Sequence, residues 1–475
     1  MANLKNFYSY LGRNDLDVKQ HQLEGVSWCL KNEQEGTQIG DDTIRGGLMA
    51  DEMGLGKTMQ MIGVMVCNIK LHTLIILPRA LIEQWTDVIK KTLGHSPLVY
   101  HGRGIKNIGI EELKKAPIVI SSYGMISLSK EQNKNLLHDM KWDRIIYDEA
   151  HHLRNSKTSV HYGARIIKSD ITWLVTGTPI QNKKNDFYSL CSIIGIPEKY
   201  YVANENLMDL VKKFIIKRTK KDAHIELPEL RINNILVEWS NANEKALAEE
   251  IHSMLNFSRV GKSHLDASMA ALGGETMFKI LPLLVRARQA CIYPALMQEN
   301  VNQLVEAGLI EESLKMVEGL TCSSKIDTVV SKILERKNNN KAKLIFCHYR
   351  GEIDVLKNEL GREGLNVKTF DGRVNTSARS DILTQKCDVL ILQIQTGCEG
   401  LNLQHFSEIY FISPHWNPAI EDQAIARCHR IGQESEIDVF RFRMVAFDDD
   451  LETRTIDEYS SDVQDAKREV MTMIN

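Results

Sequence analysis

The sequence is poor in residues that interrupt a chain or cross-link it. It has 10 prolines in 475 residues, about 2% where proteins average about 5%, so long disordered or proline-rich tracts are not expected. None of its nine cysteines forms a C-x-x-C pair, which argues against a zinc ribbon, a RING or a disulfide framework. We therefore expect a reduced, intracellular protein without a structural metal.

Long apolar runs and an excess of positive charge are also missing. No run approaches the roughly 18 apolar residues that a membrane helix needs, and residues 1–5 lead into mixed polar sequence without the features of a secretory signal. We expect neither a membrane protein nor an exported one. Lysine plus arginine total 59 and aspartate plus glutamate 62, a formal charge of −3. Any contact with nucleic acid must therefore be local.

Short apolar runs alternate with segments of helical period in two successive series. The first series comprises 47–50, 73–77, 118–121, 144–147 and 173–175, and the second comprises 343–347, 366–370, 388–392, 408–412 and 437–443. Amphipathic segments such as 59–70, 81–93 and 418–429 separate these runs. The pattern predicts an α/β fold with two parallel-sheet lobes in tandem, because crossover connections bring the strand ends to one edge.

The two lobes are expected at residues 1–228 and 229–475. Residues 241–320 contain no strand-like run and many helix formers, so they are predicted to be a helical insertion in the second lobe. An acidic tail is expected at 448–475, because residues 448–465 carry eight acids and one arginine. We interpret this tail as a solvated face or a loose end.

A glycine-rich segment follows the first apolar run and opens a predicted helix. It reads Asp-Glu-Met-Gly-Leu-Gly-Lys-Thr at 51–58. Gly54 and Gly56 lack a β-carbon, so backbone N–H groups can turn inward around phosphate oxygens beside the positive helix N-terminus. Lys57 would contact the β- and γ-phosphates and Thr58 would join a magnesium shell. The alternative is a helix cap with a chance Gly-Lys-Thr, since the strict motif has glycine in place of Asp51.

Two further motifs favour the phosphate site. The run at 144–147 ends in Asp148 and Glu149, where Asp148 would hold magnesium and Glu149 would orient or deprotonate the attacking water. For an isolated acid pair the alternative is an ordinary strand-end turn. Arg427 and Arg430 are three apart and predicted to share one helix face, so they could neutralise charge on a γ-phosphate. Their alternative is a pair of surface arginines.

These three motifs, in this order, resemble the Swi/Snf-type ATPases of helicase superfamily two. Gln22 resembles the family's adenine-reading glutamine, the segment 176–182 its coupling motif, 285–291 its helical-insert signature and 416–418 its lead-in to the arginine motif. The resemblance spans about residues 16–460 and implies two RecA-like lobes that use ATP and Mg²⁺. It implies nucleotide contacts from Gln22, Asp51, Gly54, Leu55, Gly56, Lys57, Thr58 and Gly400, magnesium at Thr58 and Asp148, and catalysis by Lys57, Asp148, Glu149, Arg427 and Arg430.

The same resemblance implies contacts to DNA. The candidate residues are Arg79, Ser121, Ser122, Tyr123, Asn182, Lys183, Thr396 and Trp416. Trp416 could instead pack between elements of its lobe, and Lys183 could belong to a solvated helix face. A departure from the family lies at 393–398, Gln-Ile-Gln-Thr-Gly-Cys, where Ser or Thr, two residues and Ala-Gly-Gly are usual. Local positive charge is available at 211–224, which holds six basic side chains and one acid.

The resemblance implies a duplex-DNA-stimulated ATPase that translocates on DNA and remodels or displaces bound proteins without obligatory strand separation. ATP between the lobes would favour a closed state that reopens on hydrolysis. We expect duplex DNA and a protein cargo or targeting partner as partners, no membrane contact, and a monomeric motor. The expected location is intracellular: the nucleus for a cellular eukaryotic protein, or the host cell or virion for a viral one.

Three alternatives stay open. A strand-separating DNA or RNA helicase usually has a Ser-Ala-Thr coupling motif and a Gln-Arg-x-Gly-Arg arginine motif, which differ from Thr-Gly-Thr-Pro at 176–179 and Arg-Cys-His-Arg at 427–430. A viral, transcription-associated DNA-dependent ATPase is suggested by the compact chain, which resembles versions carried by large DNA viruses. An inactive scaffold would be expected to lack the lysine, an acid or an arginine, and all of these are present.

Overall fold

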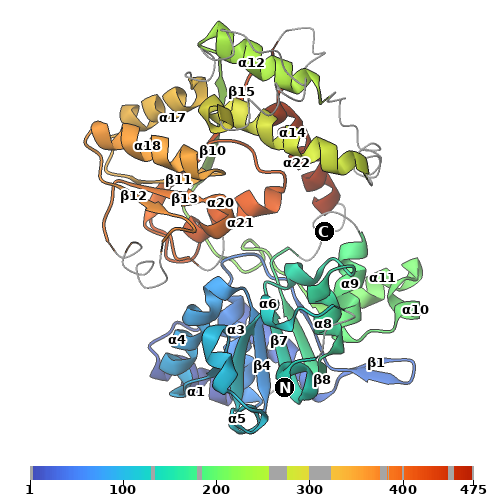
Figure 1. Cartoon of the computed structure of the whole chain (residues 1–475). Helices are drawn as coiled ribbons and strands as arrows, with labels where there is room; N and C mark the ends of the chain where they lie inside the picture. Colours follow the sequence, from blue (N-terminus) through green and yellow to red (C-terminus); the bar gives the residue numbers. More distant parts are fainter. Residues whose placement is uncertain are drawn as a thin grey trace. The chain divides into compact units, whose positions relative to one another are not determined.

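The computed structural model describes residues 4–129, 134–178, 184–255, 275–298, 323–374, 382, 385–397, 401–447 and 454–472. The chain divides into two compact units, Met1–Glu226 and Leu227–Asn475, which we call the first and the second unit (Figure 1). The division expected at 228/229 lies next to this boundary. No helix of the described residues is long and apolar enough to cross a membrane.

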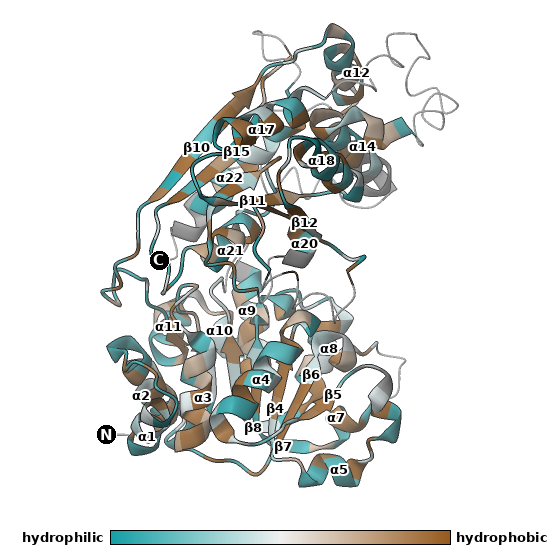
Figure 2. Cartoon of the chain, turned by 90° about the vertical axis from the view of Figure 1, so that its left-hand side faces the viewer, coloured by the Kyte–Doolittle hydropathy of each residue, from teal (hydrophilic) through white to brown (hydrophobic). Residues whose placement is uncertain are grey.

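The first unit is built on a seven-stranded parallel sheet with the order β5-β6-β4-β7-β8-β3-β9. Its strands are β3 (Gly46–Met49), β4 (Thr73–Leu77), β5 (Leu98–Tyr100), β6 (Ile118–Ser122), β7 (Lys141–Asp148), β8 (Lys168–Val175) and β9 (Ile215–Ile216). The interior strands β3, β4 and β6 are buried along their whole length, and β4 and β6 are hydrophobic in Figure 2, as expected of a parallel sheet covered on both faces. An antiparallel hairpin, β1 (Thr37–Ile39) with β2 (Asp42–Ile44), stands apart from this sheet.

Helices cover both faces of this sheet. Phe7, Val26, Met61 and Trp85 belong to the core on one face, and Leu113, Ala164, Leu190 and Leu210 to the core on the other. The first face is covered by α1 (Lys5–Arg13), α2 (Gln20–Gln34), α3 (Lys57–Cys67) and α4 (Ile82–Leu93), and the second by α5 (Ile110–Lys115), α8 (Ser159–Ile166), α9 (Lys184–Ile194) and α11 (Leu207–Phe214). Shorter helices are α6 (Tyr123–Ile126), α7 (Leu136–Asp139) and α10 (Glu198–Tyr201).

The second unit contains a six-stranded parallel sheet with the order β10-β15-β14-β11-β13-β12. Its strands are β10 (Leu230–Val237), β11 (Ala342–Cys347), β12 (Val367–Phe370), β13 (Val389–Gln393), β14 (Phe406–Phe411) and β15 (Ile437–Met444). Two parallel-sheet α/β lobes in tandem confirm the predicted fold class. The edge strand β10 was not predicted, because Arg231, Asn233 and Asn234 interrupt its apolar pattern; it pairs with β15 from Leu230 to Val237.

Helices flank the second sheet in the same way. Its elements are α12 (Ala242–Ser253), α14 (Glu275–Ile292), α17 (Ser324–Glu335), α18 (Arg350–Arg362), α20 (Ile394–Gly397), α21 (Pro418–Cys428) and α22 (Ile456–Thr472). Residues from α12, α14, α17 and α18 share one core, whereas α21 contributes to the core on the other side. Within the predicted insertion at 241–320, α12 and α14 are helical, while 256–274 and 299–320 lie outside the described residues.

The prediction of a loose acidic tail is wrong for residues 454–472. These residues form α22, in which Ile456 and Asp457 are buried. The Asp457 carboxylate pairs with the Lys325 ammonium, and neither side chain is exposed to solvent. Asp457 thus belongs to the interior of the second unit, whereas Asp462 and Asp465 lie on the exposed side of the helix, as the alternative of a solvated face predicted.

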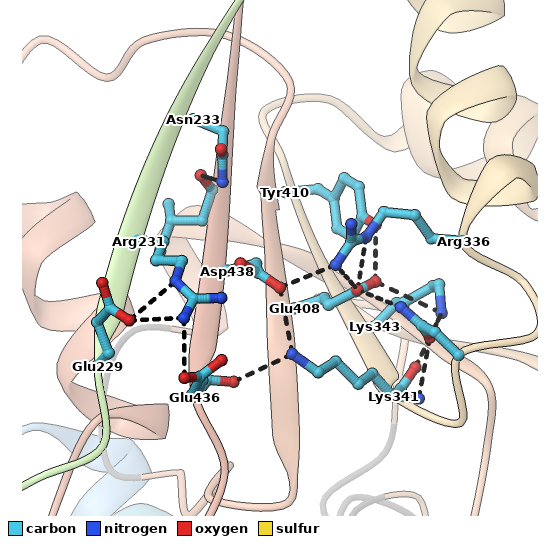
Figure 3. A network of polar contacts seen from close by, with 12 residues as sticks. Glu229, Arg231, Asn233, Arg336, Lys341, Lys343, Glu408, Tyr410, Glu436 and Asp438 are labelled. Carbon is cyan, nitrogen blue, oxygen red and sulfur yellow. Dashed lines mark hydrogen bonds and ion pairs between the residues drawn. The ribbon is translucent and has the colours of Figure 1, made fainter.

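A charge network closes the amino-terminal end of the second sheet (Figure 3). Glu408 of β14 is fully buried; it accepts a hydrogen bond from Arg336 Nε at 2.6 Å, and Lys343 Nζ lies 3.5 Å from its other oxygen. Arg336 also donates to Asp438 of β15 at 2.8 Å. Each buried charge is thus paired, as burial requires. In open α/β sheets, ligands bind at the carboxyl ends of the strands. The network lies at the other end of the sheet.

Candidate functional site

The glycine-rich loop joins β3 to α3 as predicted, and its glycines are required by its geometry. Gly54 has a φ of 94° and Gly56 a φ of 77°, both in the left-handed region that side chains disfavour. A β-carbon on Gly56 would lie only 2.4 Å from Gln22 Nε2. The Lys57 ammonium donates to the carbonyls of Asp51 at 2.9 Å and Glu52 at 3.4 Å. The loop is therefore closed around the first residue of α3.

Gln22 and His21 reach the same loop from α2. Gln22 Nε2 donates to the Leu55 carbonyl at 3.3 Å, and His21 Nε2 lies 3.0 Å from that oxygen. Both side chains are buried. The structure therefore brings Gln22 together with Leu55 and Gly56, three of the residues that the sequence assigned to nucleotide binding.

The start of the predicted coupling motif also borders the loop. Thr176 N donates to Met49 O at 3.0 Å. A β-carbon on Gly177 would lie 2.9 Å from Met53 Cγ and 3.4 Å from Lys57 Nζ. Gly177 thus lies directly against the lysine. The rest of this motif, including Asn182 and Lys183, lies outside the described residues.

Two adjacent acids end β7 near Lys57. Asp148 Oδ2 accepts a hydrogen bond from Trp85 Nε1 at 2.8 Å. Burial and then the charge of Glu149 raise the pKa of Asp148 to about 6, although the Trp85 hydrogen bond and the Lys57 charge oppose the shift. Glu149 has a φ of 51°, which is uncommon for a residue with a side chain, and its Oε2 lies 3.4 Å from His151 Nδ1.

This acid pair fits a divalent cation. Two neighbouring carboxylates repel each other, and an ion with two positive charges would relieve the repulsion that raises the pKa of Asp148. Carboxylate and hydroxyl oxygens are the ligands that Mg²⁺ prefers. Asp148 and Thr58, the second residue of α3, would supply them, and the ion would bind substrate phosphates in turn.

Arg218 is the site residue that the sequence reasoning missed. It was interpreted as part of a basic stretch, but its guanidinium pairs with the fully buried Asp51: Nε donates at 3.0 Å and Nη2 at 2.5 Å. Lys220 pairs with Glu52 at 3.3 Å and Lys213 with Asp209 at 2.7 Å. Half of the six cations at 211–224 are thus paired with acids of the first unit, which lowers the local charge offered to DNA.

Three predicted DNA contacts turn their hydroxyl groups inward. Ser121 Oγ donates to Tyr100 O at 2.7 Å, Ser122 Oγ lies 3.0 Å from His101 Nδ1, and Tyr123 Oη donates to Asp148 O at 2.6 Å. All three side chains are buried, in contrast with the expected surface contact. They close the carboxyl end of β6, and Tyr123 supports the backbone of Asp148. Arg79, which begins a short 3₁₀ helix (Arg79–Leu81), is exposed.

In the second unit, the predicted arginine pair does not share a helix face. The helix α21 ends at Cys428, and His429 has non-helical angles of φ −88° and ψ 75°, so Arg430 lies beyond the helix. The two guanidiniums are still neighbours: burial lowers the pKa of Arg430, and the charge of Arg427 lowers it further.

Trp416 packs within the second unit. The Arg288 guanidinium lies 4.9 Å from the centre of its ring, and the Tyr459 ring lies edge-on at 5.9 Å. These contacts come from α14 and α22, which agrees with the packing alternative for this residue. Thr396 lies in α20, where only its backbone is described, and Gly400 lies outside the described residues.

Comparisons with known proteins agree with this arrangement. Residues 21–203 match the SNF2-related domain, and residues 324–432 match the helicase conserved C-terminal domain. A probable global transactivator of Orgyia pseudotsugata multicapsid polyhedrosis virus is 27% identical over 97% of this chain and 91% of its own length. The DNA excision repair protein ERCC-6-like of Danio rerio is 26% identical over 89% of this chain and 34% of its own length.

One solved structure of the same kind aligns with most of the chain. The Sulfolobus solfataricus SWI2/SNF2 ATPase core in complex with dsDNA covers 90% of this chain and 88% of its own, with a TM-score of 0.41 and 23% identity. The chain spans nearly all of the viral relative but about a third of the Danio rerio protein.

The fold and the glycine-rich loop define a helicase-like α/β protein with a phosphate-binding site. The chain belongs to the Swi/Snf-type helicase-like ATPases, since an SNF2-related domain and a helicase C-terminal domain follow one another in it. The resemblance seen in the sequence is thereby confirmed.

Proposed function

We propose that this protein is an ATP-dependent translocase on duplex DNA that remodels or displaces DNA-bound proteins without obligatory strand separation. The observation that carries the proposal is that Lys57 follows β3 and that Asp148 and Glu149 lie at the end of β7, so that all three belong to the carboxyl ends of strands of one parallel sheet. This arrangement occurs in a chain that carries both domains of the family.

The first unit would supply the chemistry of ATP hydrolysis. Lys57 binds the β- and γ-phosphates, while Asp148 and Thr58 hold Mg²⁺. Glu149 orients the attacking water and accepts its proton. The inward N–H groups of the loop from Gly54 to Gly56 bind phosphate oxygens beside the N-terminus of α3. The role of Gln22 in reading adenine is part of the proposal, supported by its contact with Leu55 O.

The second unit would supply positive charge. We assign to Arg427 and Arg430 the stabilisation of charge that develops on the γ-phosphate, a role worth on the order of 10³–10⁵ in rate where such arginines act. The support is the family membership and the nearness of the two guanidiniums, since the charge of Arg427 adds to the burial that lowers the pKa of Arg430. Gly400 is assigned to the nucleotide on the family motif alone.

Duplex DNA is the proposed track. Relatives carry names that refer to DNA repair and transactivation, and the exposed Arg79 remains a candidate backbone contact, together with Asn182, Lys183 and Thr396. Contacts to phosphates position a protein without reading sequence, so little sequence preference is expected. The motor is proposed to act as a monomer and to receive its target from a protein partner.

A viral role is the second candidate function. It is supported by the similarity to the viral transactivator, which extends over 97% of this chain. In that case the protein would be a DNA-dependent ATPase that acts on transcription complexes, located in the host cell or the virion.

Steady-state ATP hydrolysis tests the proposal. The protein is assayed without nucleic acid, with duplex DNA, with single-stranded DNA and with RNA, at low and moderate salt. Stimulation by duplex DNA that weakens as salt rises would support a duplex translocase. Stimulation by RNA or single strands alone would overturn it. Displacement of a triplex-forming strand from duplex DNA then separates translocation from hydrolysis without movement.

A further inference from the structure

The segment that leaves the first unit runs along the phosphate loop. β9 pairs in parallel with β3, Ile215 opposite Leu48 and Ile216 opposite Met49. The pairing continues past both strands, because Ala50 N donates to Ile216 O at 2.8 Å and Glu52 N donates to Arg218 O at 2.9 Å. The first half of the loop is therefore held as a strand extension by residues 216–218.

The side chain of Arg218 joins three parts of the nucleotide site. Its Nε and Nη2 donate to the two oxygens of Asp51 at 3.0 and 2.5 Å, and Nη2 also donates to Gln60 Oε1 of α3 at 2.9 Å. Its Nη1 donates to the His21 carbonyl of α2. A second link follows in the chain, where Lys220 N donates to Glu52 Oε2 at 2.8 Å.

The Asp51 side chain has its hydrogen-bond partners within the first unit. Its side chain is fully buried, and its two oxygens accept from Arg218 and from Gln60 Nε2 at 3.0 Å. An acid placed here would repel phosphate if it were uncompensated. Paired with Arg218, it instead anchors the loop whose carbonyls at 51 and 52 hold Lys57. Asp51 thus has a partner more than 160 residues away in the chain, and no local sequence pattern shows it.

We propose that Arg218 is a positioning residue of the ATP site: it fixes the phosphate loop through Asp51 and connects that loop to the segment leading to the second unit. This inference rests on the proposed function and deepens it. The second unit begins at Leu227, seven residues after Lys220, so the loop is bonded to the segment that leads to that unit. A guanidinium is required, because its planar fork makes bidentate bonds that an ammonium cannot reproduce.

Arg218→Lys is the test variant and Arg231→Lys its matched control. Arg231 also makes paired bonds to acids, Glu229 and Glu436, but in the second unit and at the surface. We expect kcat/KM for ATP to fall about 100-fold in Arg218→Lys, because a misplacement of about 1 Å costs that much. Arg231→Lys should stay within about twofold. Both variants are assayed at a temperature well below their unfolding midpoints, so that a loss of stability does not lower the measured kcat/KM.

A double-mutant cycle separates positioning from a general defect. If Arg218 acts through Asp51, the two losses should not multiply: the double variant Arg218→Gln/Asp51→Asn should have a kcat/KM no lower than that of Arg218→Gln, since both changes break the same link and the second also removes the buried acid that Arg218→Gln leaves uncompensated. Losses that multiply in the double variant would overturn the inference. So would an Arg218→Lys protein that is folded and turns over ATP within twofold of the wild type.

The two proposals can fail separately. If the wild type hydrolyses ATP without a response to duplex DNA, the proposed translocase fails, and the Arg218 comparison is still read from basal hydrolysis. If the wild type does not hydrolyse ATP at all, equilibrium binding of a fluorescent ADP analogue replaces turnover. Weaker ADP binding in Arg218→Lys, with Arg231→Lys unchanged, would then support the positioning role, and equal binding would overturn it.

Discussion

At the scale of single residues, Lys57 is both a structural part of the glycine-rich loop and the residue proposed to bind the phosphates. Its ammonium is held by two carbonyls of its own loop and lies next to Gly177. Lys57→Ala removes a charge aimed at the phosphates but leaves the buried contacts of α3 in place. We predict a fall in kcat of about 10²–10³-fold or more with an unchanged unfolding midpoint. Turnover equal to that of the wild type would contradict the assignment of the active site.

Asp148 gives a second prediction at this scale, in which protons and magnesium compete for one carboxylate. With a pKa of about 6, Asp148 is largely protonated below that pH and ionised above it, so kcat/KM should fall as the pH drops through about 6. Mg²⁺ stabilises the ionised form, so a higher Mg²⁺ concentration should move the midpoint to lower pH. The pH–rate profile is measured at several Mg²⁺ concentrations.

A matched variant sharpens that measurement. The hydrogen bond from Trp85 lowers the pKa of Asp148. Trp85→Phe keeps an aromatic ring but removes this bond, so the pKa of Asp148 should rise. The midpoint of the profile should therefore move to higher pH in the variant. If the midpoint of the profile changes neither with the Mg²⁺ concentration nor with this substitution, Asp148 is not the metal ligand.

The residues of the site differ in how far the sequence alone reveals them. Lys57, Asp148 and Glu149 follow from local patterns, a glycine-rich turn after one strand and an acid pair after another. Arg218 does not, because its partner Asp51 is distant in the chain and its neighbours suggest only a basic surface. The inward direction of the Ser121 and Tyr123 hydroxyl groups was not predicted for a related reason. A motif specifies a residue type but not the direction of its side chain.

At the scale of elements, the helix α18 begins with a buried acid. Glu352 Oε2 accepts from the N–H groups of His348 and Tyr349 at 2.8 and 3.0 Å, and burial raises the pKa of Glu352 to about 7. An acid with a raised pKa stabilises the folded state below its unfolded pKa, and this stability is lost as the pH rises through about 7. Glu352→Gln keeps the acceptor oxygen and has no charge to bury.

We therefore predict that Glu352→Gln is more stable than the wild type at pH 8, by on the order of 1–3 kcal/mol, and that the gain shrinks towards pH 5. Urea unfolding at several pH values measures it. Glu359→Gln, an exposed acid of the same helix paired with Arg362, should change stability little at any pH. A gain for Glu352→Gln that does not depend on pH would contradict the titration argument.

Most central elements were predictable, and the missed ones share a cause. Strands such as β4 and β13 are almost continuous apolar runs, so their side chains are buried on both faces of the sheet. β10 and α22 are amphipathic and carry polar residues whose partners come from elsewhere in the second unit: β15 for β10 and Lys325 for Asp457 of α22. Local sequence gives these segments the composition of a loop or a solvated tail, and only tertiary pairing adds β10 to the edge of the sheet and buries the inner face of α22.

At the scale of the whole molecule, charge is the property that bears on a DNA track. The formal charge is −3, and Lys213, Arg218 and Lys220 are paired with acids of the first unit. Association with DNA must then depend on a limited set of unpaired cations and on released counterions. Each phosphate neutralised adds about 0.9 to the slope of log affinity against log salt. A motor that uses six such contacts would lose about 10³ in affinity between 50 and 200 mM salt.

We predict that the duplex DNA concentration giving half-maximal ATPase stimulation rises steeply with salt, whereas kcat at saturating DNA changes little. The reason is that salt weakens the attraction between the protein and DNA phosphates, whereas it screens the contacts around Lys57 and Asp148 much less. Arg79→Gln, which removes an exposed candidate contact, should lower the slope by about 1 and weaken binding equally on all sequences. A slope unchanged in this variant would remove Arg79 from the track, and a kcat that falls in parallel with affinity would place the salt-sensitive step within the ATPase cycle instead.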